Sequence, residues 1–279
     1  MERFLGCDKA YAKADTVLFG APFDSTTSFR PGARFASRAM RADSYALETY
    51  SPYLDADIED MMVCDAGDLE LCFGDTEKAL DAIEKKTAQL LDDRKRPVMI
   101  GGEHLVTLGA VRAAAKRYAD LHVIQFDAHA DLRDDYLGAK LSHATVMRRI
   151  HDIVGDGRIF QFGIRSGTRE EHAFGEKHTG LHSFGFAGLD TVIYNLKGKP
   201  VYFTLDLDVL DPSVFPGTGT PEPGGVSFEQ LLNAVYVAGN LDIIGCDLTE
   251  LCPVYDPSGI STAAALKILR ELLLVISEK

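Results

Sequence analysis

The chain is poor in cysteine, and its few cysteines follow no recognisable pattern. There are five in 279 residues (Cys7, Cys64, Cys72, Cys246 and Cys252), an odd number with no Cys-x-x-Cys pair. Disulfide-stapled secreted proteins and thiolate zinc sites both depend on closely spaced cysteines. The sequence therefore argues against both kinds of protein and favours a reducing compartment.

Long apolar runs are also missing. No stretch approaches the ~18 residues of a transmembrane helix, and the first residues, Met-Glu-Arg-Phe-Leu-Gly-Cys, lack the apolar segment of a secretory signal. No Gly-x-x-x-x-Gly-Lys phosphate loop is present, and the glycines of 217–221 lack the spacing of a dinucleotide fingerprint. We expect a cytoplasmic protein without a membrane partner.

Basic charge is scarce. The 29 Lys and Arg are outnumbered by 42 Asp and Glu, for a formal net charge of −13. Nucleic acids and anionic membranes require a basic surface, so we expect neither as a partner. The acidic balance is compatible with a cationic substrate or bound cations, although from net charge alone plain solubility is the better explanation.

Short apolar runs alternate with amphipathic stretches along the whole chain. We expect strands at 16–20, 61–65, 96–101, 122–126, 158–163, 200–206 and 242–247, and helices at 33–49, 75–91, 106–118, 142 onward, 227–238 and 261–276. The region 164–199 is harder to read, with a polar helix near 169–177, a weak strand at 181–184 and a short helix near 189. This βα alternation predicts one three-layer α/β domain over 1–279, with a mainly parallel sheet of about eight strands and helices on both faces. A barrel is the alternative.

Metal-competent side chains follow several of the expected strands. Asp127, His129 and Asp131 alternate just beyond 122–126, so in extended backbone they share one face. Other strands deliver further candidates at their carboxyl ends, where open parallel sheets bind ligands: His104, Asp206, Asp208 and Glu250.

Four aspartates at one edge of a sheet would repel each other unless cations neutralise them. Two divalent ions would balance the four charges, and six ligands are more than one ion needs. Oxygen-rich ligation with two imidazoles and no sulfur favours Mn²⁺ over Zn²⁺, and argues against Mg²⁺ or Ca²⁺.

Several motifs together resemble the arginase/agmatinase (ureohydrolase) family, and the resemblance covers nearly the whole chain. The motifs are Gly-Gly-Glu-His104, Asp-Ala-His-Ala-Asp131, Ser142-His143-Ala-Thr, Asp206-Leu-Asp-Val-Leu-Asp-Pro212, Pro-Gly-Thr-Gly-Thr-Pro221 and Asp247-Leu-Thr-Glu-Leu-Cys-Pro. The segments 28–35 and 48–53 resemble the agmatinase branch. Ala144 and Cys252 depart from the residues that many members carry, which concerns the substrate pocket rather than the ligands.

The resemblance implies an arginase-like fold, two Mn²⁺ per chain and a role for each ligand. His104 would bind one ion and His129 the other, while Asp127 and Asp206 bridge them. Asp131 and Asp208 would complete the two coordination spheres. The implied reaction is hydrolysis of a guanidinium to urea and an amine, with Glu250 holding the planar cation, His143 shuttling protons near the leaving amine, and Asp131 also at the catalytic centre. A homotrimer or homohexamer is implied as well.

The substrate expected from this resemblance is agmatine, which would yield putrescine, a polyamine precursor. We expect Asp134 and Asp135, in the loop after Asp131, to wall the pocket and attract the ammonium tail; a solvated charge pair is the alternative. The competing functions are a guanidinobutyrase or arginase, a mononuclear zinc deacetylase that needs only three of the ligands, and a silent binding protein.

The remaining histidines have no expected role in the site. His122 begins a strand and is expected to be a packed structural residue. The others show no ligand-like neighbours in the sequence: His151, His172, His178 and His182.

Overall fold

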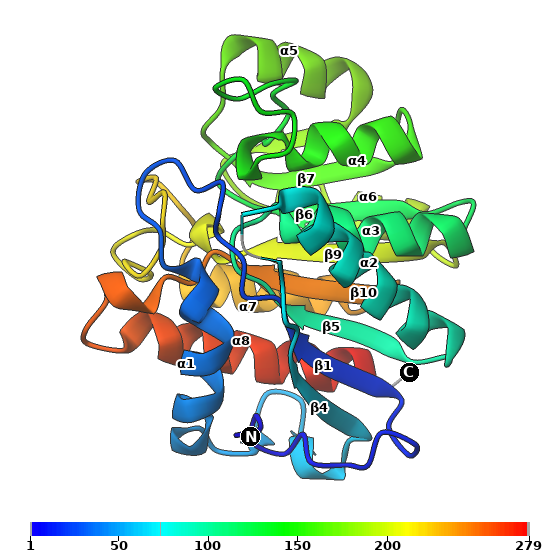
Figure 1. The fold of residues 1–279 in the computed structure, drawn as a ribbon, viewed down its shortest axis with the longest axis vertical. Helices are drawn as coiled ribbons and strands as arrows, with labels where there is room; N and C mark the ends of the chain where they lie inside the picture. Colours follow the sequence, from blue (N-terminus) through cyan, green and yellow to red (C-terminus); the bar gives the residue numbers. More distant parts are fainter. Residues whose placement is uncertain (1, 73, 278–279) are drawn as a thin grey trace.

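The computed structural model describes residues 2–72 and 74–277, and it is built around an open sheet of eight parallel strands (Figure 1). The spatial order is β4-β1-β5-β10-β9-β6-β7-β8. The strands are β1 (Thr16–Gly20), β4 (Val63–Asp68), β5 (Arg96–Ile100), β6 (His122–Phe126), β7 (Ile159–Ile164), β8 (Gly180–Ser183), β9 (Pro200–Asp206) and β10 (Asp242–Thr249). Because β4 and β8 form the two edges, the sheet is open and the barrel alternative is wrong.

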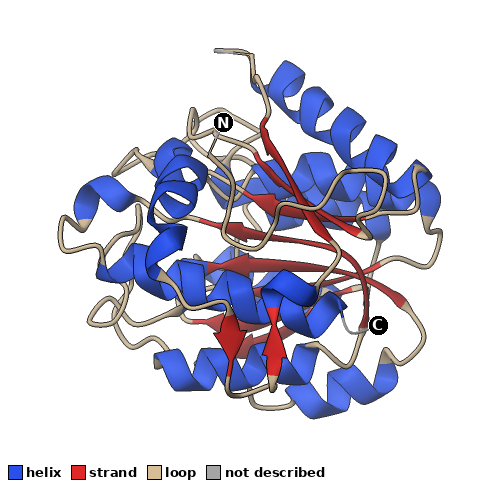
Figure 2. Ribbon diagram, turned by 90° about the horizontal axis from the view of Figure 1, so that it is seen from below, coloured by secondary structure: helices blue, strands red, loops and turns tan. Residues whose placement is uncertain are grey.

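Helices cover both faces of the sheet, as Figure 2 shows from below. One face packs against α2 (Thr76–Asp92), α3 (Val106–Arg117) and α4 (Val146–Val154). The other packs against α1 (Ala36–Asp43), α6 (Leu189–Asn195), α7 (Phe228–Ala238) and α8 (Ile260–Ser277). The three-layer α/β prediction is therefore confirmed.

Strand β9 shows how the sequence produces these two cores. Val201, Phe203 and Leu205 belong to one core, whereas Tyr202 belongs to the other. Side chains alternate between the faces of a strand, so a run that is buried on both faces is continuously apolar. Such a run reads clearly as a central strand.

The structure departs from the expected elements mainly in the N-terminal quarter. The helix expected at 33–49 is divided into a 3-10 turn η1 (Ala33–Phe35), α1 and a second turn η2 (Ser44–Ala46). Two antiparallel strands that the sequence did not indicate, β2 (Tyr50–Ser51) and β3 (Ala56–Asp57), are too short to show any periodicity.

The second strand of the sequence was expected at 61–65 but lies at Val63–Asp68, because it includes two aspartates that the apolar pattern does not reveal. Asp65 accepts hydrogen bonds from Arg41 Nε at 2.7 Å and from the Phe4 amide at 2.9 Å, and Asp68 also pairs with Arg41. Paired in this way, the carboxylates are tolerated within a strand that composition alone disfavours.

The region 164–199 contains the three elements expected of it. These are α5 (Arg169–His178), β8 and α6. Thr168 and Glu171 form a capping box at the start of α5, which fixes the position of that helix. Among the described residues, no helix is long and apolar enough to cross a membrane.

Candidate metal centre and substrate pocket

The candidate centre lies at the carboxyl ends of β5, β10, β9 and β6, the four neighbouring strands in the middle of the sheet. His104 follows β5, and Asp127, His129 and Asp131 follow β6. Asp206 ends β9, Asp208 lies in the 3-10 turn η5 (Leu207–Val209), and Glu250 follows β10. Because parallel strands end at one edge of the sheet, residues up to 146 positions apart in sequence reach the same point.

Three carboxylates surround the imidazole of His104. Its Nδ1 lies 2.9 Å from Asp127 Oδ2, 3.1 Å from Asp131 Oδ2 and 3.4 Å from Asp206 Oδ2. All four side chains are buried. The donor atoms of His104, Asp127 and Asp131 lie close enough together to hold one ion.

A second group forms beside the first and shares Asp127 with it. His129 Nδ1 lies 3.0 Å from Asp208 Oδ2 and 3.6 Å from Asp127 Oδ1. Asp127 thus faces His104 with one oxygen and His129 with the other. Asp206 Oδ1 accepts the Asp208 amide at 2.9 Å, which places Asp206 beside the second group as well. Two neighbouring ions with shared carboxylates fit this arrangement.

The protonation of His104 provides a direct test of this fit. Its Nε2 lies 2.9 Å from Thr204 Oγ1, and Thr204 Oγ1 in turn donates to Asp247 Oδ1 at 2.6 Å. The hydroxyl proton is therefore engaged, so Thr204 accepts the Nε2 proton of His104, and the neutral form of the ring carries its lone pair at Nδ1. That Nδ1 is buried and has no hydrogen-bond partner although three carboxylates surround it. A cation among these atoms would satisfy all four groups.

The acidity of the carboxyl groups reflects the same crowding. Burial, together with the charges of Asp208 and Asp127, raises the pKa of Asp206 well above its usual range. Burial and the charge of Asp127 raise the pKa of Asp131 to about 7. Burial also opposes ionisation of Asp127, but the neighbouring imidazoles of His104 and His129 outweigh it and lower the pKa of that carboxyl. Asp131 and Asp206 therefore resist ionisation in the protein alone, whereas bound cations would favour their charged forms.

Glu250 lies beside these ligands in a strained conformation. Its φ is +64° and that of Asp131 is +53°. Residues other than glycine rarely adopt positive φ values, and those that do cluster at functional sites. Glu250 Oε1 accepts the His104 amide at 2.8 Å, and the Glu250 amide donates to Gly102 O at 2.9 Å. Burial and nearby carboxylates, Glu103 first, raise the pKa of Glu250 well above its usual range. A cation bound beside this carboxyl group would favour its ionised form.

His143 forms part of the pocket wall and is held by a turn. It opens the 3-10 turn η4 (His143–Thr145), which Ser142 and Thr145 cap before α4 begins. Its amide donates to Thr26 Oγ1 at 3.1 Å, and its Nε2 lies 3.3 Å from Ser28 Oγ. Burial lowers the pKa of His143 to about 4, so the ring is neutral at pH 7.

Thr26 is in turn fixed by Glu103, a residue that sequence reasoning did not single out. Glu103 Oε2 accepts the Thr26 amide at 2.9 Å and the Thr27 hydroxyl at 3.0 Å, and Oε1 accepts the Thr26 hydroxyl at 2.5 Å. Burial raises the pKa of Glu103 to about 7. Its position directly before His104 in the Gly-Gly-Glu-His segment was the available signal.

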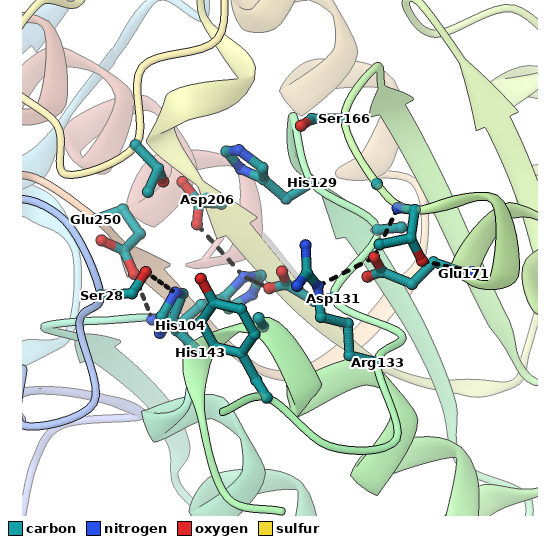
Figure 3. A pocket seen from close by; sticks show the side chains of 16 residues that line it. Ser28, His104, His129, Asp131, Arg133, His143, Ser166, Glu171, Asp206 and Glu250 are labelled. Atoms are coloured by element: carbon teal, nitrogen blue, oxygen red, sulfur yellow. Dashed lines mark hydrogen bonds and ion pairs between the residues drawn. The ribbon is translucent and has the colours of Figure 1, made fainter. Parts of the chain in front are cut away.

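A cavity of about 290 Å³ opens above the two metal groups (Figure 3). Its inner part is lined by His104, His129, Asp131, His143, Asp206 and Glu250. Its other walls include Arg133, Tyr136, Ser166, Thr168, Glu171, Thr220 and Ser28. The cavity has the volume of a small-molecule site.

The loop after Asp131 lines this cavity differently from expectation. Asp134 is exposed and accepts a hydrogen bond from Arg149 at 2.6 Å, while Asp135 accepts the Gly138 amide at 2.8 Å. Neither side chain lines the cavity, so the expectation that they attract the substrate tail is wrong. Each instead satisfies a local partner, which is the usual role of exposed aspartates in turns.

Arg133 and Glu171 take the place expected of those aspartates. Arg133 Nε lies 3.2 Å from Glu171 Oε2, and its guanidinium lies 4.6 Å from the centre of the Tyr136 ring. Glu171 also accepts the Leu132 and Thr168 amides at 3.1 Å and 2.8 Å. The capping pattern Thr168-x-x-Glu171 was readable in the sequence, but nothing there indicated that it borders the cavity.

Comparison with known proteins agrees with this geometry. The Arginase family model matches residues 14–275. The agmatinase of Bacillus subtilis (strain 168) is 44% identical over 97% of this chain and 95% of its own length. A crystal structure from Clostridium difficile, provisionally described as an agmatinase, is 54% identical, has a TM-score of 0.94 and covers 96% of this chain and 99% of that one.

A third similar protein has the same fold but is named for a different substrate. The structure of proclavaminate amidino hydrolase from Streptomyces clavuligerus is 32% identical, with a TM-score of 0.89, and covers 99% of this chain and 97% of that one. Similarity of fold therefore extends to proteins named for different amidino substrates.

Proposed function

The chain belongs to the arginase family, and on this premise we propose that it hydrolyses agmatine to putrescine and urea. It is a hydrolase that acts on a guanidino C–N bond. The observation that carries the proposal is the buried Nδ1 of His104, which has no hydrogen-bond partner and lies within 3.4 Å of three carboxylate oxygens, at the base of the cavity.

Two divalent ions, which we propose to be Mn²⁺, would be held by the residues of the two groups. His104 and Asp131 would bind one ion, His129 and Asp208 the other, and Asp127 and Asp206 both. When bound, such ions lower the pKa of a water molecule so that it can attack at neutral pH, and they stabilise the negative charge that develops.

Glu250 would bind the guanidinium. Its carboxyl group lines the cavity, and a planar cation can form paired charge-assisted hydrogen bonds with a carboxylate. The raised pKa of Glu250 does not oppose this role, because an approaching cation favours the ionised form. Held there, the central carbon would face the metal groups.

His143 would transfer the proton that the leaving amine requires. Water adds to the guanidinium carbon, the bond from that carbon to the substituted nitrogen breaks, and the products are urea and a protonated amine. Neutral at pH 7, His143 can accept a proton and pass it to the departing nitrogen. Asp131, which lines the cavity beside His104, would orient the attacking water.

The outer wall of the cavity bears on the choice of substrate. Glu171 offsets the charge of Arg133 at 3.2 Å, so the wall carries no excess positive charge that would repel the ammonium tail of agmatine. A guanidino acid such as 4-guanidinobutyrate is the second candidate, because Arg133 presents a cation there with a side chain 35% exposed. Whole-chain similarity to agmatinases supports agmatine.

A substrate panel tests the proposal. Urea release from agmatine, arginine and 4-guanidinobutyrate is measured with Mn²⁺ supplied, for the wild type and for Glu250→Gln. The control Glu229→Gln changes an exposed carboxylate on α7. We expect kcat/KM for agmatine to exceed that for arginine by at least ~10²-fold, and Glu250→Gln to abolish most of the activity. A preference for either acid would overturn the choice of substrate.

We also propose that the protein works in the cytoplasm as a trimer or hexamer. Cys7, Cys64, Cys246 and Cys252 are free thiols, which suits a reducing compartment. Exposed aromatic side chains, among them Phe29, Tyr45 and Tyr53, support a covered surface. Light scattering coupled to size-exclusion chromatography tests the assembly.

A further inference from the structure

A second group of potential ligands lies at the ends of α4 and α5. His151 is in the last turn of α4, Asp156 follows that helix, and His178 is the last residue of α5. Figure 1 shows both helices in green at the top of the view. The expectation that these histidines lack ligand-like neighbours is wrong, because residues 27 positions apart in sequence converge on one aspartate.

The three side chains meet at a single oxygen atom. Asp156 Oδ1 lies 2.7 Å from His151 Nε2 and 2.8 Å from His178 Nδ1. All three donor atoms lie within 4.8 Å of one another. If two nitrogens and one oxygen bind the same ion, each at about 2.1 Å from the ion, each nitrogen lies roughly 2.9–3.4 Å from the oxygen. The observed separations need to open by only a few tenths of an ångström.

Phe174 holds both imidazoles in place. Its ring contacts His151 edge-on, with centroids 5.0 Å apart, and stacks on His178 at 4.4 Å. The guanidinium of Arg148 also lies over the Phe174 ring, 3.9 Å from its centre. The two histidine side chains are 15% and 23% exposed, whereas that of Asp156 is 68% exposed. Two partly buried imidazoles and one exposed carboxylate therefore lie together at the surface.

We propose that His151, Asp156 and His178 bind a divalent cation of the Zn²⁺ type at the protein surface, separately from the catalytic centre. Two imidazoles and one carboxylate match the ligands of Zn²⁺, Ni²⁺ or Cu²⁺ better than those of Mn²⁺. A neutral imidazole carries its proton on either nitrogen, so each ring can offer a lone pair without changing its charge.

A cation at this position would join two helices that begin at the substrate cavity. His143 lies in the turn that leads into α4, and the capping box of Thr168 and Glu171 begins α5. Both capping residues line the cavity. Binding would therefore connect the ends of these helices that lie away from the cavity.

Equilibrium dialysis of the Mn²⁺-loaded protein tests the proposal, with Zn²⁺ as the probe and Mn²⁺ kept in excess to occupy the catalytic centre. The wild type is compared with His151→Gln, His178→Gln and Asp156→Asn. The matched control is His122→Gln, because His122 also stacks on a phenylalanine, Phe160, but its ring bonds a backbone carbonyl. Hydrogen exchange over 146–154 and 169–178 provides a second readout.

We expect the wild type and the control to bind one Zn²⁺ per chain more than the three variants do. The affinity of the His151, Asp156 and His178 site for Zn²⁺ should be at least tenfold lower in each variant. In the wild type, Zn²⁺ should slow exchange severalfold in both helices. Equal uptake by all five proteins would mean that Zn²⁺ binds at the catalytic centre alone, and would overturn the proposal. Unchanged exchange in the wild type would do the same.

Discussion

Thr204→Val isolates the contact that orients the His104 imidazole. Thr204 is fully buried, and its hydroxyl has three partners, His104 Nε2 at 2.9 Å, Asp247 Oδ1 at 2.6 Å and Thr107 Oγ1 at 3.3 Å. Valine has nearly the same shape but neither accepts nor donates, so the ring proton of His104 loses its acceptor. Asp247 keeps the hydroxyl of Tyr202 at 2.8 Å, so it remains partly satisfied.

Two magnitudes follow from these contacts. A buried donor left without a partner costs about 1–3 kcal/mol of folding free energy. Loss of the group that orients a metal-binding histidine typically weakens metal affinity by roughly 10–100-fold, which corresponds to about 1.4–2.7 kcal/mol. We therefore expect Thr204→Val to need 10–100 times more Mn²⁺ for half-maximal urea release, while kcat at saturating Mn²⁺ falls much less.

The assay is urea release as a function of free Mn²⁺, together with metal content after dialysis against a chelator. Thr87→Val is the matched control, because Thr87 is equally buried and its hydroxyl has no hydrogen-bond partner. Thr204→Ser restores the hydroxyl and should recover most of the affinity. If Thr204→Val needs the same Mn²⁺ concentration as the wild type within twofold, the orientation argument is refuted.

Three further results are expected. His143→Asn should lower turnover by roughly 10²–10⁴-fold with metal content unchanged, and wild-type turnover would exclude its role in proton transfer. Asp127→Ala should lose both ions by metal analysis, because this carboxylate faces both groups; retention of one ion would show that it does not bridge. The folded-state pKa of His143 is about 4, below its value of 6.5 when unfolded, so in the metal-free protein this residue binds fewer protons in the folded than in the unfolded state between these pH values. The contribution of His143 to the unfolding free energy should therefore fall as pH drops from 6.5 to 4, and in denaturant titrations the wild type should lose stability relative to His143→Asn over that window.

The sequence by itself determined the sheet and the positions of the ligands. Apolar runs such as 122–126 and 200–206 can be buried on both faces only as central strands, and parallel strands must end at one edge. The sequence therefore predicts Asp127, His129 and Asp131 beside Asp206, and the structure places them together.

The tertiary structure alone decided which loop side chains reach the cavity and which contacts support the ligands. Asp134 and Asp135 adjoin Asp131 in sequence but turn towards Arg149 and Gly138, while Arg133 faces Glu171. A loop has no period of 2 or 3.6 residues, so the direction of each side chain depends on partners distant in sequence. The same reason hid the link from His104 through Thr204 to Asp247, and the meeting of His151 with His178 at Asp156, since each requires the packing of elements whose spacing no sequence pattern records.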